Sequence, residues 1–177
     1  MAITNPRREN ADGNTITKAL VGDEVYLCAD VTDIADGTTA KIKIVEKDAD
    51  GNDDDVTTLS AKVQNNKIEC AWKVVYTADD DDADSKKEQE EKGYTLPEYA
   101  FTVECGGEKS TESRQLDVRG GLKVIVKDVQ SNSPFGNVKI SLWNKERKFR
   151  EFITNGNGYF ELLDIPIEKF EIELENK

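Results

Sequence analysis

Apolar side chains in this chain alternate with polar ones over short stretches, and this alternation limits the possible folds more than any other feature. In residues 68–76, five apolar or sulfur-bearing side chains would share one face: Ile68, Cys70, Trp72, Val74 and Tyr76. A period of two residues is typical of a half-buried strand, whereas an amphipathic helix repeats its apolar residues about every 3.6 residues. No window of helical length carries a sustained helical stripe. The sequence therefore predicts an all-β protein.

The same alternation predicts further strands in the first two thirds of the chain, at residues 25–31, 41–46, 59–63, 99–105 and 116–118. Pairs that tolerate a positive φ angle lie between them: Gly22-Asp23, Asp36-Gly37, Asp50-Gly51, Asn65-Asn66 and Gly106-Gly107. About seven strands at this spacing predict an immunoglobulin-like sandwich of two antiparallel sheets over residues 12–118. Residues 1–11 precede the first predicted strand and are expected to form an N-terminal arm.

The pattern restarts after Arg119-Gly120-Gly121, which is the best candidate for a linker at 119–121. Beyond it, strands are expected at residues 122–126, 138–142, 149–154, 159–163 and 170–174. These strands predict a second, smaller β-sandwich over 122–177. The chain would then be two tandem antiparallel β-sandwich domains.

Residues 77–93 interrupt the alternation. They carry eight acidic residues against three lysines and no large apolar side chain. Such a segment buries too little apolar surface to offset its ordering entropy. It is expected to be a mobile acidic surface loop.

Charge and composition exclude several functions. The formal net charge of -12 opposes binding to the phosphates of DNA or RNA, so no nucleic acid partner is expected. The chain has no histidine, which removes Ser-His-Asp and Cys-His catalysis and HExxH zinc sites together. No other motif points to a named reaction, and we expect a protein that is not an enzyme and needs no cofactor.

No apolar run approaches the roughly 20 residues that cross a bilayer, and the N-terminus lacks the apolar segment of a Sec signal peptide. Membrane insertion is therefore not expected. The three cysteines, Cys28, Cys70 and Cys105, form no CxxC pair and allow one disulfide at most. Three reduced thiols are favoured over one bridge; if a bridge forms, strand parity favours Cys70 with Cys105.

Two groups of residues are candidate binding sites. Asp48, Asp50 and Asn52 begin like a calcium-binding EF-hand loop, although Asp53 and Leu59 occupy positions that need glycine and glutamate. A charged hairpin turn is the competing interpretation. Trp143, Phe149 and Tyr159 could form an aromatic patch for a protein partner, because aromatic residues are enriched in binding hot spots. Each could equally belong to the core.

The last third contains five stretches with a family-like pattern: Val124-Ile-Val126-Lys-Asp128, Pro134-Phe-Gly-Asn-Val138-Lys-Ile140-Ser-Leu142, Thr154-Asn-Gly-Asn-Gly158-Tyr-Phe160, Ile165-Pro166 and Phe170-Glu-Ile172-Glu-Leu174. Together they resemble the transthyretin-like, or carboxypeptidase regulatory-like, family. The family's usual Pro-Gly before the last strand is replaced here by Ile167-Glu168-Lys169. The resemblance implies a small β-sandwich that acts as an accessory module.

The first part carries a second, looser pattern in Val21-Gly22-Asp23-Glu24-Val25, Asp36-Gly37-Thr38, Glu46-Lys-Asp48-Ala-Asp50-Gly51 and Trp72. These residues are similar to those of immunoglobulin-like modules appended to bacterial type VI secretion and contractile-injection spikes. Transthyretin-like extensions are also found on such spikes, where the family resemblance implies cargo docking. We expect a structural or docking protein that binds a spike or effector component, in the bacterial cytoplasm before assembly and then exported with the apparatus. The alternative is an extracellular adhesion or spacer module, stabilised by calcium.

Overall fold

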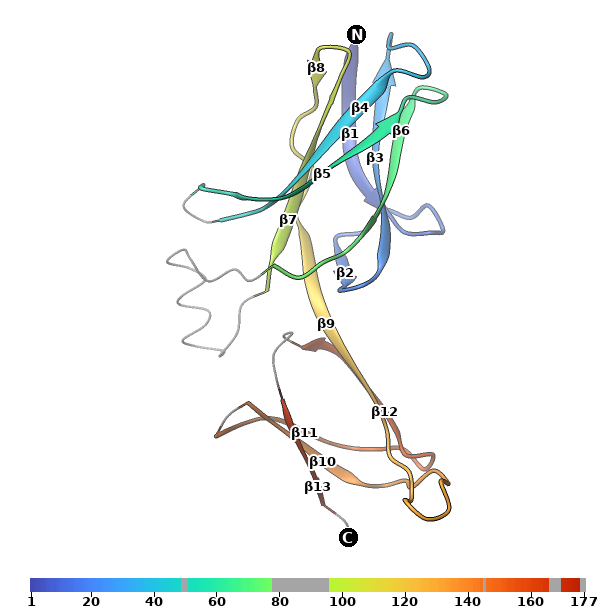
Figure 1. Ribbon diagram of the computed structural model, residues 1–177, viewed down its shortest axis with the longest axis vertical. Helices are drawn as coiled ribbons and strands as arrows, with labels where there is room; N and C mark the ends of the chain where they lie inside the picture. The colour runs from blue at the N-terminus through green and yellow to red at the C-terminus, as the bar shows by residue number, and fades with distance from the viewer. Residues whose placement is uncertain (49–50, 78–95, 145, 166–169, 176–177) are drawn as a thin grey trace. The chain divides into compact units, whose positions relative to one another are not determined.

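The computed structural model describes residues 1–48, 51–77, 96–144, 146–165 and 170–175, without the side chain of Asp164. These residues form strands and turns and no helix, which confirms the predicted all-β sandwich class (Figure 1). The chain divides into two compact units, Met1–Arg119 and Gly120–Lys177. No helix in the described residues is long and apolar enough to cross a bilayer.

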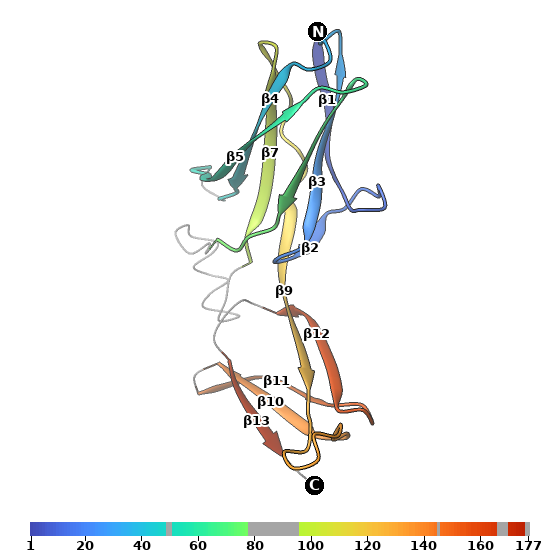
Figure 2. The same ribbon diagram turned by 45° about the vertical axis from the view of Figure 1, so that its right-hand side comes forward.

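The first unit contains two sheets. One has the order β1-β3-β6, formed by β1 (Ala2–Glu9), β3 (Glu24–Thr32) and β6 (Lys67–Lys73). The other contains β9-β7-β4-β5, in the strands β9 (Leu116–Ile125), β7 (Glu98–Cys105), β4 (Thr39–Glu46) and β5 (Asp54–Lys62). β2 (Lys18–Leu20) pairs in parallel with residues 117–119 of β9, and β8 (Glu108–Lys109) pairs with β7. Figure 2 shows the two sheets from a second direction.

The apolar residues of the alternating pattern form the core of this unit. Buried side chains alternate with exposed ones along β4, and those of Ile42 and Ile44 are fully buried. They belong to one cluster with alternate residues of β3, such as Leu27, and of β7, such as Phe101. Each such side chain stabilises the fold by about 1.5–3 kcal/mol relative to an exposed one, so the paired sheets are the main source of stability.

The prediction of an N-terminal arm over residues 1–11 is wrong, because Ala2–Glu9 form strand β1, which pairs with β3. Only Ile3 supplies an apolar core side chain there, and Arg8 is the other buried residue. The pairing also shifts register between Thr4 and Arg7, where Asn5 has a φ of 52°. The sequence therefore shows no alternation that would mark a strand.

The turns follow the predicted chemistry. Asn65 and Asn66 have φ angles of 51° and 60°, and Gly106 and Gly107 have φ angles of 60° and 86°. Two successive positive φ angles match the twist of a tight hairpin, and asparagine and glycine adopt them at the lowest cost. Gly106 and Gly107 join β7 to β8, so the Gly-rich stretch is a turn.

The second unit contains a sheet and a two-stranded ribbon. The sheet has the order β11-β10-β13, in the strands β11 (Arg147–Ile153), β10 (Lys139–Asn144) and β13 (Glu171–Glu175). The ribbon pairs residues 120–125 of β9 with β12 (Tyr159–Ile165). The expected linker 119–121 is thus part of strand β9. Leu142, Leu162 and Ile165 are the buried residues of a small apolar cluster, with partly buried aromatic residues around them.

Candidate functional site

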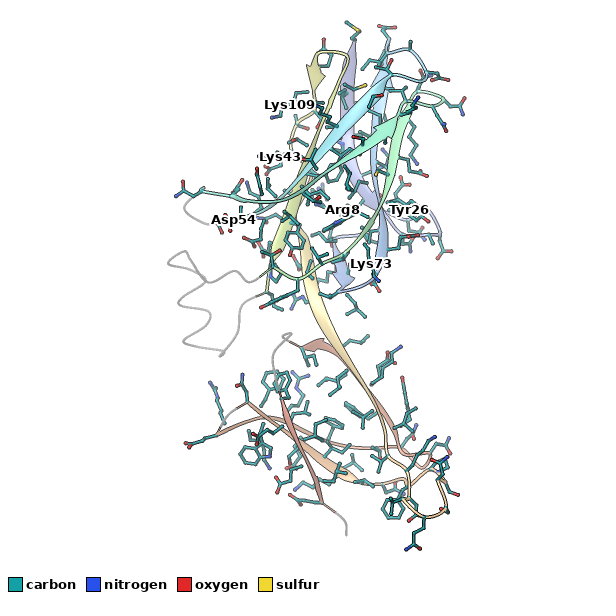
Figure 3. All side chains as sticks on the ribbon, in the orientation of Figure 1. Arg8, Tyr26, Lys43, Asp54, Lys73 and Lys109 are labelled. Carbon is teal, nitrogen blue, oxygen red and sulfur yellow. The ribbon has the colours of Figure 1, made fainter. Side chains whose placement is uncertain are left out.

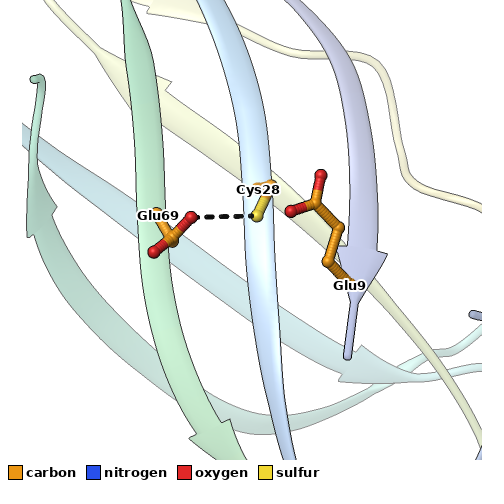
Figure 4. Close-up of side chains that lie close together, drawn as sticks. All are labelled: Glu9, Cys28 and Glu69. Atoms are coloured by element: carbon orange, nitrogen blue, oxygen red, sulfur yellow. Dashed lines mark hydrogen bonds between the residues drawn. The ribbon is translucent and has the colours of Figure 1, made fainter. Parts of the chain in front are cut away.

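A thiol and two carboxylates meet on the outer face of the sheet β1-β3-β6. Glu9 lies on β1, Cys28 on the central strand β3 and Glu69 on β6 (Figure 4). Cys28 faces Arg7 on one side and Glu69 on the other in the strand register. One possible ligand atom from each of the three residues lies within 4.8 Å of the others. This is a grouping that could hold a metal ion.

Two cations already contact these carboxylates. The Nζ atom of Lys67 lies 3.2 Å from Oε2 of Glu9 and 2.7 Å from Oε2 of Glu69. The Nε atom of Arg7 lies 2.7 Å from Oε1 of Glu9, and its Nη1 atom lies 2.9 Å from Oδ1 of Asp30. The carboxylates are therefore part of an ion-pair network that joins the three strands.

The thiol of Cys28 is protonated in this setting. Its side chain is fully buried, and desolvation, with the neighbouring charge of Glu9, raises its pKa to about 12. Hydrogen bonds from Arg7 and Lys67 outweigh desolvation at Glu9 and lower the pKa of that carboxyl group. The pKa of Asp30 is lowered in the same way by Asn5 and Arg7.

Metal binding at this cluster would require the loss of the Cys28 thiol proton and of the ion pairs made by Glu9 and Glu69. A metal-bound cysteine must be a thiolate, yet the surroundings of Cys28 favour the thiol. An incoming ion would also have to displace the ammonium group of Lys67 from Glu9 and Glu69. We therefore interpret the cluster as a structural ion-pair network that covers the Cys28 thiol.

Arg8 occupies the opposite face of β1 and enters the core, with 3% of its surface exposed (Figure 3). Its Nη1 atom donates to the carbonyl oxygen of Arg114 at 2.5 Å and its Nη2 atom to that of Tyr99 at 2.7 Å. The guanidinium carbon lies 5.0 Å from the ring centre of Phe101. Burial lowers the pKa of Arg8 to about 10. Arg8 therefore links β1 to the backbone of β7 at Tyr99 and to the segment that contains Arg114.

The predicted calcium ligands are only partly described. Asp50 lies outside the described residues. Asp48 is buried, whereas Asn52 is exposed. The neighbouring carboxylate of Asp53 accepts hydrogen bonds from the Lys47 ammonium group and from the backbone N–H of Asp48. This supports the hairpin-turn interpretation for the described part of the segment, and calcium binding there stays a prediction.

The three aromatic residues predicted as a patch lie in three different places. Trp143 is half-buried beside Lys148 and donates a hydrogen bond from Nε1 to Oε2 of Glu173 at 3.0 Å. Phe149 packs against the small apolar cluster, with its ring centre 5.1 Å from that of Phe170. Tyr159 donates a hydrogen bond to Glu161 on β12. Phe149 is partly buried against this cluster and Tyr159 lies on the ribbon, so their described contacts differ, and partner binding by these three residues stays a prediction.

All three cysteines are free, so the alternative disulfide between Cys70 and Cys105 is not formed. Cys105 is buried at the end of β7. Cys70 is half-buried and lines a shallow groove of about 510 Å³, together with residues of β5 such as Ser60 and Ala61. Desolvation raises the pKa of the Cys70 thiol. The acidic loop predicted at 77–93 lies almost wholly outside the described residues.

Sequence reasoning missed an apolar surface on β13. Ile172 and Leu174 are 50% and 55% exposed, although they pair in register with the buried Leu142 and Ile140 of β10. They therefore lie on the inner face of the sheet without being covered. The strict alternation of glutamate with apolar residues in β13 was the available signal, but it predicts only a strand.

Comparisons with known proteins do not identify a family. No family model matches the chain, and no curated protein matches it. Among solved structures, the chain is similar to the alkylpurine DNA glycosylase AlkC of Pseudomonas fluorescens bound to DNA containing an abasic-site analogue, with 11% identity and a TM-score of 0.36. The match covers 66% of this chain and 30% of that protein. A likeness at this level carries no argument about function.

Proposed function

We propose that this chain is a non-enzymatic docking protein of a bacterial secretion or contractile-injection assembly that binds spike or effector components through its β-sandwich surfaces. The observation that carries the proposal is the exposed apolar surface of β13, where Ile172 and Leu174 are about half exposed. Half-exposed aliphatic side chains at the margin of a small core are suited to burial against another protein.

The strand order supports the immunoglobulin-like part of the proposal. Sheets β1-β3-β6 and β5-β4-β7-β9 correspond to strands A-B-E and C′-C-F-G of a variable-type immunoglobulin domain. Tyr99 near the start of β7 adds to this, because its hydroxyl accepts a hydrogen bond from the backbone N–H of Thr77 at 2.8 Å. Immunoglobulin domains also carry a tyrosine near the start of strand F, although theirs bonds to backbone a few residues upstream and Thr77 lies 22 residues upstream of Tyr99. Domains of this architecture commonly bind other proteins.

The secretion assembly enters the proposal through the sequence resemblance of both parts to modules on such spikes. The network at Cys28 is consistent with a role without catalysis, since its thiol is protonated and its carboxylates are paired. The net charge of -12 further favours protein partners with basic surfaces over nucleic acid.

The test is crosslinking with mass spectrometry in a bacterium that contains a contractile-injection apparatus. The full chain is compared with the double variant Ile172→Lys/Leu174→Lys and with the control Val129→Lys, which replaces a 97% exposed apolar residue in the turn between β9 and β10. We expect spike or effector components to be crosslinked to the wild type and the control. Their recovery should fall at least about tenfold in the double variant, as for a hot-spot contact.

Two results would contradict the proposal. One is the absence of any spike or effector component among the crosslinked proteins. The other is equal recovery by the wild type and a folded double variant. Circular dichroism of both variants establishes that they are folded, which is expected because both substituted side chains on β13 already contact solvent.

A further inference from the structure

We infer that β13 binds an extended segment of a partner protein as an added strand, and that this segment alternates apolar residues with lysine or arginine. The inference rests on the proposed docking function and specifies its site and the chemistry of the partner. It follows from three properties of β13: an open edge, an apolar inner face and an acidic outer face.

The first property is the open edge. β13 pairs with β10 along one side, and no strand in the described residues pairs with its other side. Its register with β10 has no shift, so all five residues lie in regular strand geometry. Backbone N–H and C=O groups on such an edge can pair with another strand.

The opposite edge of the same sheet is protected. The pairing of β11 with β10 contains a register shift between Leu142 and Trp143. β11 also carries the cations Arg147, Lys148 and Arg150. Bulges and charges, lysine above all, are the usual means by which proteins prevent strand addition. β13 has no bulge and no lysine; its charges are three glutamates, which repel an acidic strand but not a basic one. The contrast favours β13 as the binding edge.

The second property is the position of the apolar side chains. Ile172 and Leu174 are two residues apart and lie on the same face as Leu142 and Ile140. An added strand would continue this face, so its own alternate residues would lie beside Ile172 and Leu174. Apolar residues at those positions of the partner would bury the surface that β13 leaves exposed.

The third property selects the charge of the partner. Glu171, Glu173 and Glu175 share the outer face of β13. Glu175 pairs with Lys139 of β10 at 3.2 Å, which shows that cations on a neighbouring strand reach these carboxylates. A partner strand with lysine or arginine on this face would make the same cross-strand pairs from the open side.

This charge pattern also disfavours a second copy of the chain at the same edge. When β13 pairs with another β13 in a register that keeps the apolar side chains of both strands together, the glutamates of both strands lie on one face. Like charges directly across a sheet are destabilising. A different protein with a basic alternating segment fits the edge better.

The probe is an uncharged-ended peptide of about seven residues, a typical strand length, in which valine or isoleucine alternates with lysine. Binding to the full chain is measured by fluorescence anisotropy. Four control peptides are used: a scrambled peptide of the same composition, an alternating peptide with glutamate for lysine, and two peptides N-methylated on alternate residues. Because a strand presents alternate N–H groups to each edge, one N-methylated peptide should bind and the other should not.

Two variants locate the site. Ile172→Lys places a charge on the inner face of the edge and should weaken binding of the alternating basic peptide at least about tenfold. Glu171→Lys should weaken it about threefold and improve binding of the acidic peptide by a similar factor, as expected for one exposed cross-strand pair. Val129→Lys should bind the basic peptide as the wild type does.

The outcomes separate this inference from the proposed function. Equal binding of the scrambled peptide, or indifference to N-methylation on either edge, would overturn strand addition. Equal binding of the acidic peptide would overturn the charge selection. Self-association of the chain that is lost in Ile172→Lys would identify a second copy as the occupant and also overturn the inference. If the cellular crosslinks depend on Ile172 and Leu174 but no alternating peptide binds, the docking function stands and the strand mechanism fails.

Discussion

Arg8 shows how a single charged residue can hold a strand that lacks an apolar pattern. Its side chain is buried beneath β1, bonded to the carbonyl groups of Tyr99 and Arg114 and placed over the ring of Phe101. Burying the cation is costly, as its lowered pKa of about 10 indicates. The two charge-assisted hydrogen bonds offset part of that cost. A buried arginine is therefore a source of specificity for the position of β1.

Replacing Arg8 by methionine should reduce the free energy of unfolding by about 1–3 kcal/mol, because the carbonyl groups of Tyr99 and Arg114 lose their donor. Removing the buried charge limits the loss. Urea denaturation followed by tryptophan fluorescence measures the change. Arg114→Met is the matched control: its side chain is exposed, and it should change stability by less than about 0.5 kcal/mol. Equal stability of Arg8→Met and the wild type would show that Arg8 does not anchor β1.

The cysteines should differ in reactivity in the folded protein. At pH 8 a thiol with a pKa near 12 is ionised to only about one part in ten thousand, and the Cys28 thiol is also buried. Cys70 is half-buried, and Cys105 is buried. We expect iodoacetamide to label Cys70 first, and Cys28 only after the sheet β1-β3-β6 opens.

Peptide mass mapping after timed labelling measures this order. In guanidinium chloride all three cysteines should react at similar rates, and Cys70→Ser should remove the fast phase in the native protein. Rapid labelling of Cys28 in the folded protein would contradict the burial of its thiol.

At the scale of the elements, the sequence predicts strands that have an apolar face and misses those that lack one. β3, β4 and β7 follow the predicted alternation closely, because alternate residues in each are buried. β1 was missed because Arg8 takes a core position and a register shift follows Thr4. The network at Cys28 could not be predicted either, since it depends on the pairing of three strands from distant parts of the chain. Register depends on how strands pair in the folded sheet, and the alternation along a single strand does not reveal it.

The turn before β12 offers a test of backbone geometry within one element. Gly158 has a φ of 68°, and a Cβ atom there would lie 2.4 Å from the carbonyl oxygen of Val126. Gly156 is close in sequence, and a Cβ atom there would meet nothing within 4 Å. Gly158→Ala should therefore lower the free energy of unfolding by about 1–3 kcal/mol, from both the strained φ and the clash.

Gly156→Ala is the control and should change stability by no more than about 1 kcal/mol. Thermal denaturation of both variants beside the wild type provides the measurement. If the two variants have equal midpoints, the close approach of Gly158 to Val126 does not exist in solution.

For the whole molecule, the net negative charge and the lowered carboxyl pKa values have opposite effects on the stability of the folded state. The net charge of -12 disfavours the compact state through self-repulsion. At the same time, ion pairs and hydrogen bonds lower the pKa of carboxyl groups in both units, including Glu9, Asp30, Asp128 and Glu151. Exposed ion pairs contribute about 0–1 kcal/mol each, so the long-range repulsion should dominate at neutral pH.

Salt and acid should therefore have opposite effects on the thermal unfolding midpoint. Sodium chloride at pH 7 should raise it by screening the repulsion. A carboxyl group with a lowered pKa stabilises the fold fully above its unfolded pKa, and this contribution is lost as the pH falls through the folded value. At pH values below about 4, these carboxyl groups bind protons, and the thermal unfolding midpoint should therefore decrease. A midpoint that decreases with salt at pH 7 would show that the ion pairs outweigh the repulsion.

The shielded thiol on β3 has a practical consequence for kinetics. Because Cys28 lies between β1 and β6 beside the side chains of Glu9 and Glu69, local detachment of either edge strand would expose it to a reagent. Its labelling rate would then measure how often β1 or β6 detaches, without an engineered probe. A lower rate after a partner is added would show that the sheet opens less often.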